Sequence, residues 1–444
     1  MLDYKVFPFI DPELVFANIA NTEGAIFLDS SGQHSQFGRY SFILLNPIQQ
    51  YSPHDIPILM QLQQWSELIA ANATKYDANL PPFTGGLAGY FSYDLNKQLE
   101  YIPSTSSKSV ADYYLGLYNQ VMAFDCVENK CYVMVSRVNG INLDYQRQLD
   151  DLISLYYSSQ SLIAISNLPA ISVSSNFSKI QYMEKVALAR QMILNGDIFE
   201  VNIAQKFSGK VDANYRADML YRKLRRLNEA PFSAWLNLGK LKILSASPER
   251  FVMLKNGHIE ACPIKGTCKR SHDLLQDRQL ADALSQSTKN RAENIMIVDL
   301  MRNDLGKICK PGSVKVSKLC NIESFTNVHH LVSTIEGDLK DNVAMFDIIP
   351  ACFPGGSVTG APKIRAMQII EELENSSRGV YCGSIGYFGF NGNVDLSIAI
   401  RTIVVHNNEL SFQVGGAVTL DSDPEDEYNE TLIKGQKLLE AINK

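Results

Sequence analysis

The sequence predicts an α/β protein of the mixed, α+β kind, and two observations lead to this fold class. Residues 1–150 carry short apolar runs separated by turn residues, which is typical of strands. After residue 178, helical periodicity and strand-like runs follow one another. Residues 151–178 between them are rich in Ser and Asn and contain Pro, which indicates a linker. We therefore expect an N-terminal region (1–150), a linker (151–178) and a C-terminal region (179–444).

Composition and charge narrow the class of protein. The chain has 444 residues, of which 45% are apolar and 20% charged, as in ordinary soluble globular proteins. Its 41 basic and 47 acidic residues give a net charge of −6, which excludes a broad basic surface for nucleic acid or anionic lipid. The eight cysteines are scattered without a CxxC pair, and we find no signal peptide or membrane-length apolar run. We expect a cytoplasmic protein with reduced thiols and with no nucleic-acid or membrane partner.

Individual elements follow from cap, turn and periodicity signals. Ser178 and Gln181 have the spacing of a capping box, which predicts the start of a helix. Gly196 is expected to end this helix. The glycine-rich run at 85–90 favours close strand packing over phosphate binding, because no helical pattern follows it. The other predicted elements are strands at 25–28, 40–45, 86–93, 119–125, 130–137 and 198–207, and helices at 215–228, at 273–309 with a break near Ser287, and from Pro424 onward.

The stretch from residue 243 to 270 carries two chemical groups. Apolar runs on either side of Asn256-Gly257 predict a β-hairpin whose return strand continues to Ile264. Glu249 lies in a Ser-Pro-Glu-Arg-Phe corner, and Lys265 follows the return strand. Among apolar neighbours this lysine should lose hydration, which would lower its pKa from about 10.4 and free the amine as a nucleophile. The alternative is an exposed lysine after an edge strand.

Two further segments suit a ligand but also have an ordinary explanation. Glu427, Glu430 and Lys434 fall on one face of the last helix, where two carboxylates could hold Mg²⁺, yet a solvated acidic face has the same pattern. Residues 351–366 form a glycine-rich loop before a helix, whose free N–H groups suit a carboxylate or phosphate. A helix cap without any ligand accounts for that loop equally well.

Taken in order, eight segments of the second half resemble the chorismate-utilising enzymes. The resemblance covers residues 175–440 and extends weakly over the N-terminal half. It implies two interleaved subdomains with large, mostly antiparallel sheets and flanking helices, in which residues 179–444 form the chorismate-binding catalytic domain. The segments are SPERF (247–251), PIKGT (263–267), AENIMIVDLMRNDLG (292–306), VHHLVSTIEG (328–337), PGGSVTGAPKIRAMQ (354–368), RGVYCGSIGY (378–387), DLSIAIRT (395–402) and GGAVTLDSDPEDEYNETLIK (415–434).

Within this family, Lys265 makes the chain resemble component I of the aminodeoxychorismate synthases. Anthranilate synthases carry a small residue in the corresponding Pro-Ile-x-Gly-Thr, which leaves ammonia room to reach C2 of chorismate. The resemblance implies that Lys265 instead attacks C2 as the C4 hydroxyl leaves, and that ammonia then adds at C4 as the lysine departs, on the route to 4-aminobenzoate and folate. The alternatives are anthranilate or isochorismate chemistry at C2, and a catalytically silent binding or scaffolding subunit.

The resemblance also implies roles for single residues. Glu249 would be the general acid at the leaving hydroxyl and then the base toward ammonia, which needs a raised pKa. His330, rather than His329, would lie beside the substrate ring. The Mg²⁺ ligands would be Glu293 and Glu430, with Glu427 as a direct or water-mediated one. The remaining substrate contacts would be Ser357, Tyr381, Arg401, Gly415, Gly416 and Lys434, among which Tyr381 and Arg401 would hold the enolpyruvyl carboxylate.

Partners are implied by the resemblance as well. A tryptophan pocket of relatives corresponds to Ser30, Arg39, Tyr40, Ser41, Pro231 and Phe232, although small residues that pack a barrel give the same pattern. The chain shows no glutaminase set of Cys, His and Glu, so ammonia is expected from a separate glutamine amidotransferase subunit. Ala417 stands where many relatives have a glycine, so the backbone there is expected to approach the substrate differently.

Overall fold

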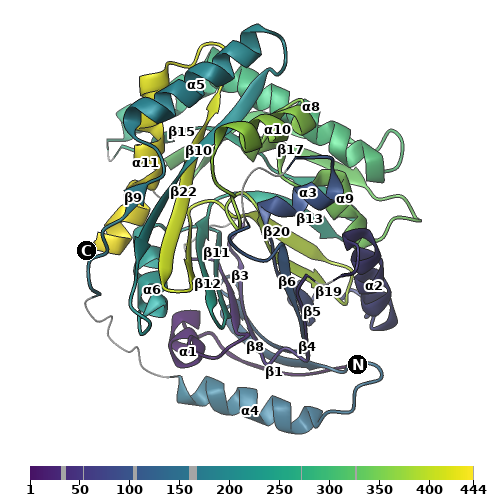
Figure 1. Ribbon diagram of the computed structural model, residues 1–444. Coiled ribbons are helices and arrows are strands. Elements are labelled where there is room, and N and C mark those ends of the chain that lie inside the picture. Colours follow the sequence, from purple (N-terminus) through teal and green to yellow (C-terminus); the bar gives the residue numbers. More distant parts are fainter. Residues whose placement is uncertain are drawn as a thin grey trace.

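Two large sheets, each built from both halves of the chain, form the centre of the molecule (Figure 1). The computed structural model describes residues 1–31, 37–53, 55–103, 108–159, 168–271, 273–325 and 328–443. Within these ranges the strand pairings are antiparallel. The α+β class and the interleaved antiparallel arrangement are therefore confirmed.

The first sheet has twelve strands within the described ranges. Eleven of them follow one another in a single order of neighbours, and the twelfth, β9 (Ser174–Ser175), pairs with β10 outside that order. The order is β1 (Leu2–Pro8), β8 (Lys130–Ser136), β7 (Gln120–Asp125), β3 (Tyr40–Leu45), β2 (Ile26–Asp29), β11 (Phe232–Leu238), β12 (Leu241–Ser247), β21 (Thr402–His406), β22 (Glu409–Val418), β10 (Glu200–Lys210) and β18 (Gly360–Ala361).

The second sheet has ten strands in the same described part of the chain. Strand β16 (Lys315–Ser324) pairs with β17 beside the main path. The order along that path is β15 (Ile264–Lys269), β17 (Val328–Asp338), β14 (His258–Ala261), β13 (Arg250–Lys255), β20 (Val394–Ile398), β19 (Ser384–Gly389), β5 (Gly86–Phe91), β6 (Tyr113–Tyr118) and β4 (Gln49–Tyr51).

Helices cover the outer faces of both sheets. One apolar cluster joins α1, α4, α6 and α11 to the first sheet. Another joins α2, α8 and α9 to the second sheet and also includes α5 and α10, which pack on β10 of the first. A third cluster, with Phe42, Tyr90 and Tyr387, lies between the two sheets. The helices are α1 (Pro12–Ile19), α2 (Ile58–Ala71), α3 (Asn96–Leu99), α4 (Tyr145–Ser158), α5 (Lys179–Leu194), α6 (Ala217–Leu227), α7 (Leu274–Gln286), α8 (Thr288–Ile308), α9 (Ile348–Cys352), α10 (Lys363–Leu373) and α11 (Pro424–Asn443), with 3-10 turns η1 (Tyr93–Leu95), η2 (Met345–Asp347) and η3 (Gly356–Val358).

Local signals predicted several of these elements well. Ser178 and Gln181 form the capping box of α5. Ser287 ends α7 and caps α8 through its hydroxyl, which accepts a hydrogen bond from the Asn290 N–H, so the predicted break is confirmed. Close strand packing at residues 85–90 is also confirmed, because a Cβ at Gly89 would meet the Tyr114 carbonyl oxygen at 1.9 Å.

Two predictions about connections were wrong. The predicted linker begins with ordered helix, since α4 runs to Ser158, is capped by Asp144 and packs on β8 through apolar residues. Part of that linker, residues 160–167, lies outside the described residues. The hairpin turn at Asn256-Gly257 is correct, with φ values of 52° and 78°, but its return strand ends at Ala261 because Pro263 has no N–H to donate. Lys265 lies instead in β15, which pairs with β17.

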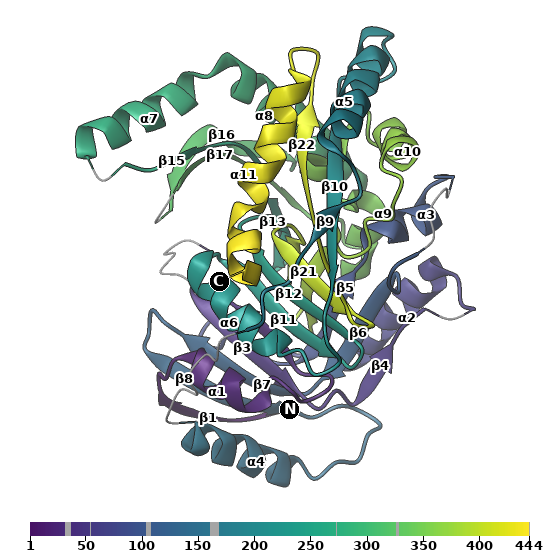
Figure 2. The same cartoon turned by 60° about the vertical axis from the view of Figure 1, so that its left-hand side comes forward.

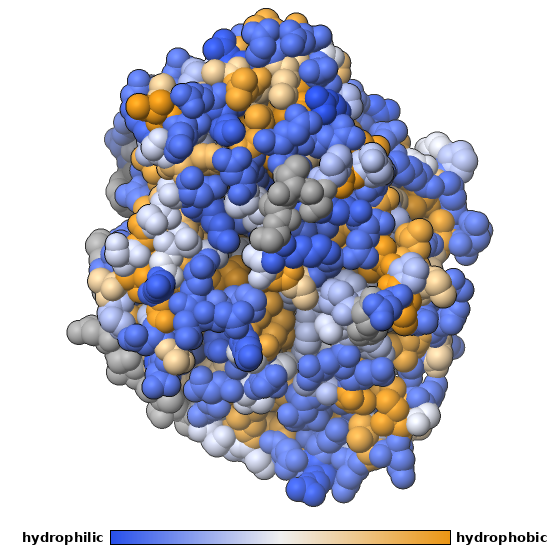
Figure 3. Space-filling model, viewed as in Figure 1, coloured by the Kyte–Doolittle hydropathy of each residue, from blue (hydrophilic) through white to orange (hydrophobic). Residues whose placement is uncertain are grey.

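The surface agrees with the composition. Figure 3 shows hydrophilic residues over most of one face, interrupted by small apolar patches. Among the helices of the described ranges, none combines the length and the apolar character needed to cross a bilayer. All eight cysteines are unpaired.

Candidate active site

The candidate site lies where strands near one end of each sheet approach each other beneath α8 and α11 (Figure 2). Strands β10 and β22 belong to the first sheet, and β15 and β17 to the second. A salt bridge joins the two sheets here, because the Glu200 carboxylate on β10 lies 2.5 Å from the Lys265 amine on β15. The arrangement places a buried cation among several carboxylates.

Lys265 is held by an irregularity of β15. The pairing with β17 shifts register between Ile264 and Thr267, and Gly266 adopts a positive φ of 90°. A Cβ at Gly266 would also come within 3.1 Å of Asn290 and Leu284, so glycine suits this position on both counts. The bulge turns the Lys265 side chain into the interior, where the residue is only 7% exposed. The exposed-lysine alternative is therefore wrong.

The predicted direction of the Lys265 pKa was also wrong. Burial alone would lower the pKa of the amine, but Glu200, Glu293 and Glu249 outweigh it and raise that pKa above its ordinary value. The sequence pattern revealed the burial of the lysine and not the carboxylates around it. Lys265 in this structure is a buried ammonium that must lose a proton before its nitrogen can attack.

Glu249 lies between β12 and β13 and is 5% exposed. Its Oε1 accepts hydrogen bonds from the Ser357 hydroxyl at 2.6 Å and from the Ile264 N–H at 3.4 Å. Burial raises the pKa of this carboxyl to about 7, although both hydrogen bonds oppose the shift. A carboxyl with such a pKa can give and take a proton near neutral pH.

Three glutamates from α8 and α11 border the same region. Burial raises the pKa of Glu293 to about 7 and also raises that of Glu427. Glu293 Oε1 and Glu427 Oε2 are buried without a hydrogen-bond partner within the described ranges, while Glu430 pairs with Lys434 at 2.6 Å. In the part of the chain that the structure describes, no three potential ligands lie close enough together to hold a metal ion. Mg²⁺ nevertheless fits this donor set, because it needs only one or two carboxylates beside water and substrate oxygens.

Arg401 and His330 differ in charge and lie close enough to interact electrostatically. Arg401 follows β20 with a φ of 53°, and its guanidinium donates to the Lys434 carbonyl oxygen. Among the described residues Arg401 forms no salt bridge, so its charge is available to an anion, although burial lowers its pKa. His330 on β17 bonds the Thr267 hydroxyl through Nδ1 at 2.7 Å. Burial lowers the pKa of His330 to about 4, which keeps this imidazole neutral.

The remaining predicted contacts lie along β22 and α11. Gly415 and Gly416 pair with Ala204 and Ile203 of β10. A Cβ at Gly416 would lie 2.8 Å from Glu427 Oε2, so the glycine leaves room for that carboxylate. Lys434 also donates to the Gly415 carbonyl oxygen at 3.0 Å. Ala417 follows in the same strand.

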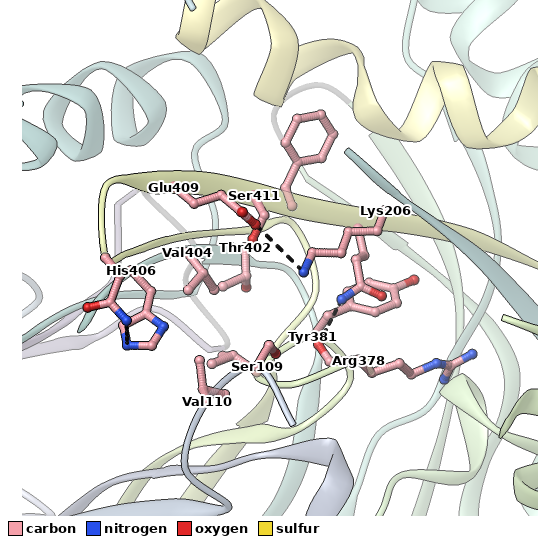
Figure 4. Close-up of a pocket in the computed structure, with 14 residues that line it drawn as sticks. Ser109, Val110, Lys206, Arg378, Tyr381, Thr402, Val404, His406, Glu409 and Ser411 are labelled. Atoms are coloured by element: carbon pink, nitrogen blue, oxygen red, sulfur yellow. Dashed lines mark hydrogen bonds and ion pairs between the residues drawn. The ribbon is translucent and has the colours of Figure 1, made fainter. Parts of the chain in front are cut away.

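Tyr381 is buried, interacts electrostatically with Arg401 and lines a polar pocket of about 370 Å³ (Figure 4). Lys206 and Glu409 form a 3.9 Å ion pair at this pocket, and Figure 4 shows the Arg378 guanidinium pointing away from it. Arg378 instead pairs with the buried Glu374 at 2.6 Å. Of the predicted site residues, only Tyr381 lines the pocket. The pocket therefore adjoins the candidate site but is not part of it.

Most of the residues predicted to form a tryptophan pocket line a separate cavity of about 240 Å³. Ser41 does not line it, because its hydroxyl bonds the Asp29 carboxylate and the Ser30 N–H. The Arg250 guanidinium lies 5.1 Å from the centre of the Phe232 ring at this cavity. The predicted residues that do line it are Ser30, Arg39, Tyr40, Pro231 and Phe232.

Glu200 is the residue that sequence reasoning missed. Its carboxylate is 1% exposed and lies directly against Lys265. The available signal was an acidic residue between Phe199 and Val201 in a predicted strand, because a buried carboxylate needs a partner.

Comparisons with known proteins agree with this geometry. The family model described as chorismate binding enzyme matches residues 24–440. Aminodeoxychorismate synthase component 1 of Salmonella typhimurium is 42% identical over 374 residues, which cover 81% of this chain and 77% of that protein. Anthranilate synthase component 1 of Aquifex aeolicus is 37% identical over 440 residues, covering 94% and 89%.

A solved structure shows the same fold. Anthranilate synthase component I from Streptococcus pneumoniae superposes with a TM-score of 0.79 at 30% identity, covering 92% of this chain and 95% of that one. A family match over nearly the whole chain, together with relatives well above 30% identity, means that this chain belongs to the chorismate binding enzymes.

Proposed function

We propose that the chain is component I of an aminodeoxychorismate synthase, which converts chorismate and ammonia to 4-amino-4-deoxychorismate. Relatives named for both C4 and C2 amination are similar to it, so the name of a relative does not decide between the two reactions. The observation that carries the proposal is the Lys265 amine, buried at the junction of the sheets beside three carboxylates. A side chain that fills this space favours covalent attack over direct entry of ammonia at C2.

The proposed reaction has two displacements. The Lys265 nitrogen forms a bond to C2 of chorismate, the ring double bond shifts, and the C4–O bond breaks. Glu249 gives the leaving hydroxyl its proton, so that water departs. Ammonia then bonds C4, the double bond shifts back, and the C2–N bond breaks. Glu249 takes a proton from the new ammonium group, and the enolpyruvyl ether stays intact.

Substrate charge is matched by groups of this chain. Chorismate carries two carboxylates. The Arg401 guanidinium, which forms no salt bridge within the described ranges, suits the enolpyruvyl one, with Tyr381 beside it. Glu293 and Glu430, with Glu427, would hold Mg²⁺ near the ring carboxylate. When bound, the ion supplies positive charge that offsets the repulsion between this carboxylate and the glutamates. His330, being neutral, can border the ring without adding charge.

Ammonia is proposed to come from a separate glutamine amidotransferase subunit in the cytoplasm. The relatives are named component 1, which supports a second component. Eight unpaired cysteines support a reducing compartment.

The identity of the product tests this proposal. The purified chain is given chorismate, Mg²⁺ and excess ammonium at mildly alkaline pH, where free ammonia replaces the glutaminase. We expect a product that an added lyase converts to 4-aminobenzoate. Fluorescent anthranilate with free pyruvate would assign the chain to C2 amination instead, and unconsumed chorismate would favour a silent binding subunit.

Glu430→Gln is expected to raise the Mg²⁺ concentration needed for half-maximal activity several-fold, because one anionic ligand is lost. Activity and calorimetric Mg²⁺ titrations measure the effect. Asp426→Asn, an exposed change on the same helix, is the matched control and should leave both titrations unchanged. If Glu430→Gln titrates like the wild type, Glu430 is not a ligand.

We also propose that the 240 Å³ cavity takes tryptophan. Saturating tryptophan should then raise the melting temperature by several degrees, since a ligand at a hundredfold excess over its Kd stabilises the folded state by about 2.7 kcal/mol. Phe232→Ala should reduce this shift, while Phe199→Ala, at an exposed residue that does not line the cavity, should not. A melting temperature that does not depend on tryptophan would mean that the cavity does not bind it.

A further inference from the structure

Glu200 has an unusual environment for a carboxylate. It is 1% exposed, and its Oε1 lies 2.5 Å from Lys265 Nζ. Its Oε2 is buried and has no hydrogen-bond partner in the described part of the chain. A carboxylate kept in the interior with one free oxygen and one short contact to an amine is placed to exchange a proton with that amine.

The other carboxylates around Lys265 are less suited to this exchange. Glu293 faces it from α8, Glu249 from the β12–β13 corner and Glu430 from α11, but the hydrogen bond of the amine within the described ranges goes to Glu200. Glu249 must carry a proton to assist departure of the C4 hydroxyl. The group that deprotonates Lys265 must be ionised at the same moment. One carboxyl cannot meet both requirements, so two are needed.

We propose that Glu200 is the catalytic base of Lys265, taking the ammonium proton when the nitrogen attacks and returning it when the nitrogen departs. This role rests on the proposed covalent function and deepens it. Lys265 and Glu200 form a salt bridge in the free protein. Proton transfer converts it to a neutral amine and a neutral carboxyl, which burial of both side chains favours.

The proton balance closes over one turnover. Before attack, the Lys265 proton moves to Glu200 Oε1, and the free nitrogen lone pair bonds C2. Glu249 releases its own proton to the leaving hydroxyl. When ammonia bonds C4, Lys265 leaves C2 as a neutral amine and recovers its proton from Glu200, while Glu249 recovers one from the new amino group. Chorismate and ammonia become the aminated product and water, and both carboxyls regain their starting states.

Single-turnover formation of the covalent adduct tests this role. Wild type, Glu200→Gln and Glu200→Asp are mixed with chorismate and Mg²⁺ without ammonia, quenched in acid, and analysed by intact mass between pH 6 and 8. The rate of adduct formation depends on Glu249 in the same way in all three proteins. The ratio of the wild-type rate to the variant rate therefore reports the contribution of Glu200 alone. For Glu200→Gln we expect this ratio to exceed 100 at pH 6 and to fall about tenfold per pH unit, because the amine must lose its proton to water. Glu200→Asp keeps a carboxylate and should show a ratio independent of pH.

A second measurement does not require turnover. Competitive acetylation of Lys265, read by peptide mass, reports the titration of its amine in each variant. Loss of the neighbouring anion should lower the pKa of Lys265 in Glu200→Gln but not in Glu200→Asp. Melting temperatures identify variants that fail to fold. If Glu200→Gln does not fold, Glu200→Asp is compared with the wild type instead.

The outcomes separate the two proposals. A Glu200→Gln ratio that stays constant with pH, or an unchanged Lys265 titration, overturns the role of Glu200 while the covalent function stands. A wild-type chain that turns chorismate over without forming any adduct overturns the covalent function, and the base role with it.

Discussion

Lys265→Ala is expected to bind chorismate but to lose C4 amination, with the rate falling by a factor on the order of 10⁴ or more, as for removal of a covalent nucleophile in other enzymes. The reason is that the C4 hydroxyl departs only when a nucleophile bonds C2, and the alanine side chain offers none. Product is measured by the lyase-coupled assay, and binding by calorimetry.

The alanine change also leaves the Glu200 charge buried without its partner, which could cost about 3–5 kcal/mol of stability. Lys265→Arg controls for this loss, because the guanidinium keeps a positive charge beside Glu200 yet is not deprotonated in proteins. It should be as inactive as the alanine variant. Lys269→Ala, at an exposed position of the same strand, should retain full activity. Wild-type rates in either Lys265 variant would contradict the covalent reaction.

Glu249→Gln has the second largest expected effect, a fall in rate of about 10²–10⁴-fold, the usual contribution of a general acid. Glutamine keeps the size of the side chain and an oxygen for the Ser357 hydroxyl, but it cannot transfer a proton. Because burial holds the pKa of Glu249 at about 7, the acid form decreases as pH rises through 7. At constant free ammonia, kcat/KM for chorismate should therefore decline through that pH in the wild type.

Ser357→Ala gives an independent check on that assignment. The Ser357 hydroxyl donates to the Glu249 carboxylate and lowers its pKa, so its removal should raise the pKa and move the decline of kcat/KM to higher pH. The Glu249→Gln variant should show no such decline. A decline that keeps its position in Glu249→Gln would assign the titration to another group.

The parts of the fold that sequence predicted well depend on short stretches of chain. The Ser178–Gln181 capping box, the cap at Ser287 and the turn at Asn256-Gly257 each need only a few neighbouring residues, and all three are present. The order of strands in the sheets depends on contacts between distant residues. Lys265 lies in a strand paired with β17 rather than just after the hairpin, and the sequence alone could not predict this pairing.

The candidate site shows the same limit at the level of charge. Glu200 and Lys265 are 65 residues apart in the chain, and only the approach of β10 to β15 brings them together. The neighbours of the lysine suggested burial, which was correct. The direction of its pKa depends on carboxylates from three other segments, so the local pattern gave the wrong sign.

The most direct test of the central claim is to locate the covalent bond. The wild-type chain is mixed with chorismate and Mg²⁺ in the absence of ammonia, quenched in acid and digested, and the peptide that contains Lys265 is sequenced by mass spectrometry. We expect a mass increase on Lys265 equal to chorismate less one water, which disappears when ammonia is added before the quench. Formation of the 4-amino product by a chain whose Lys265 never carries this mass would contradict it.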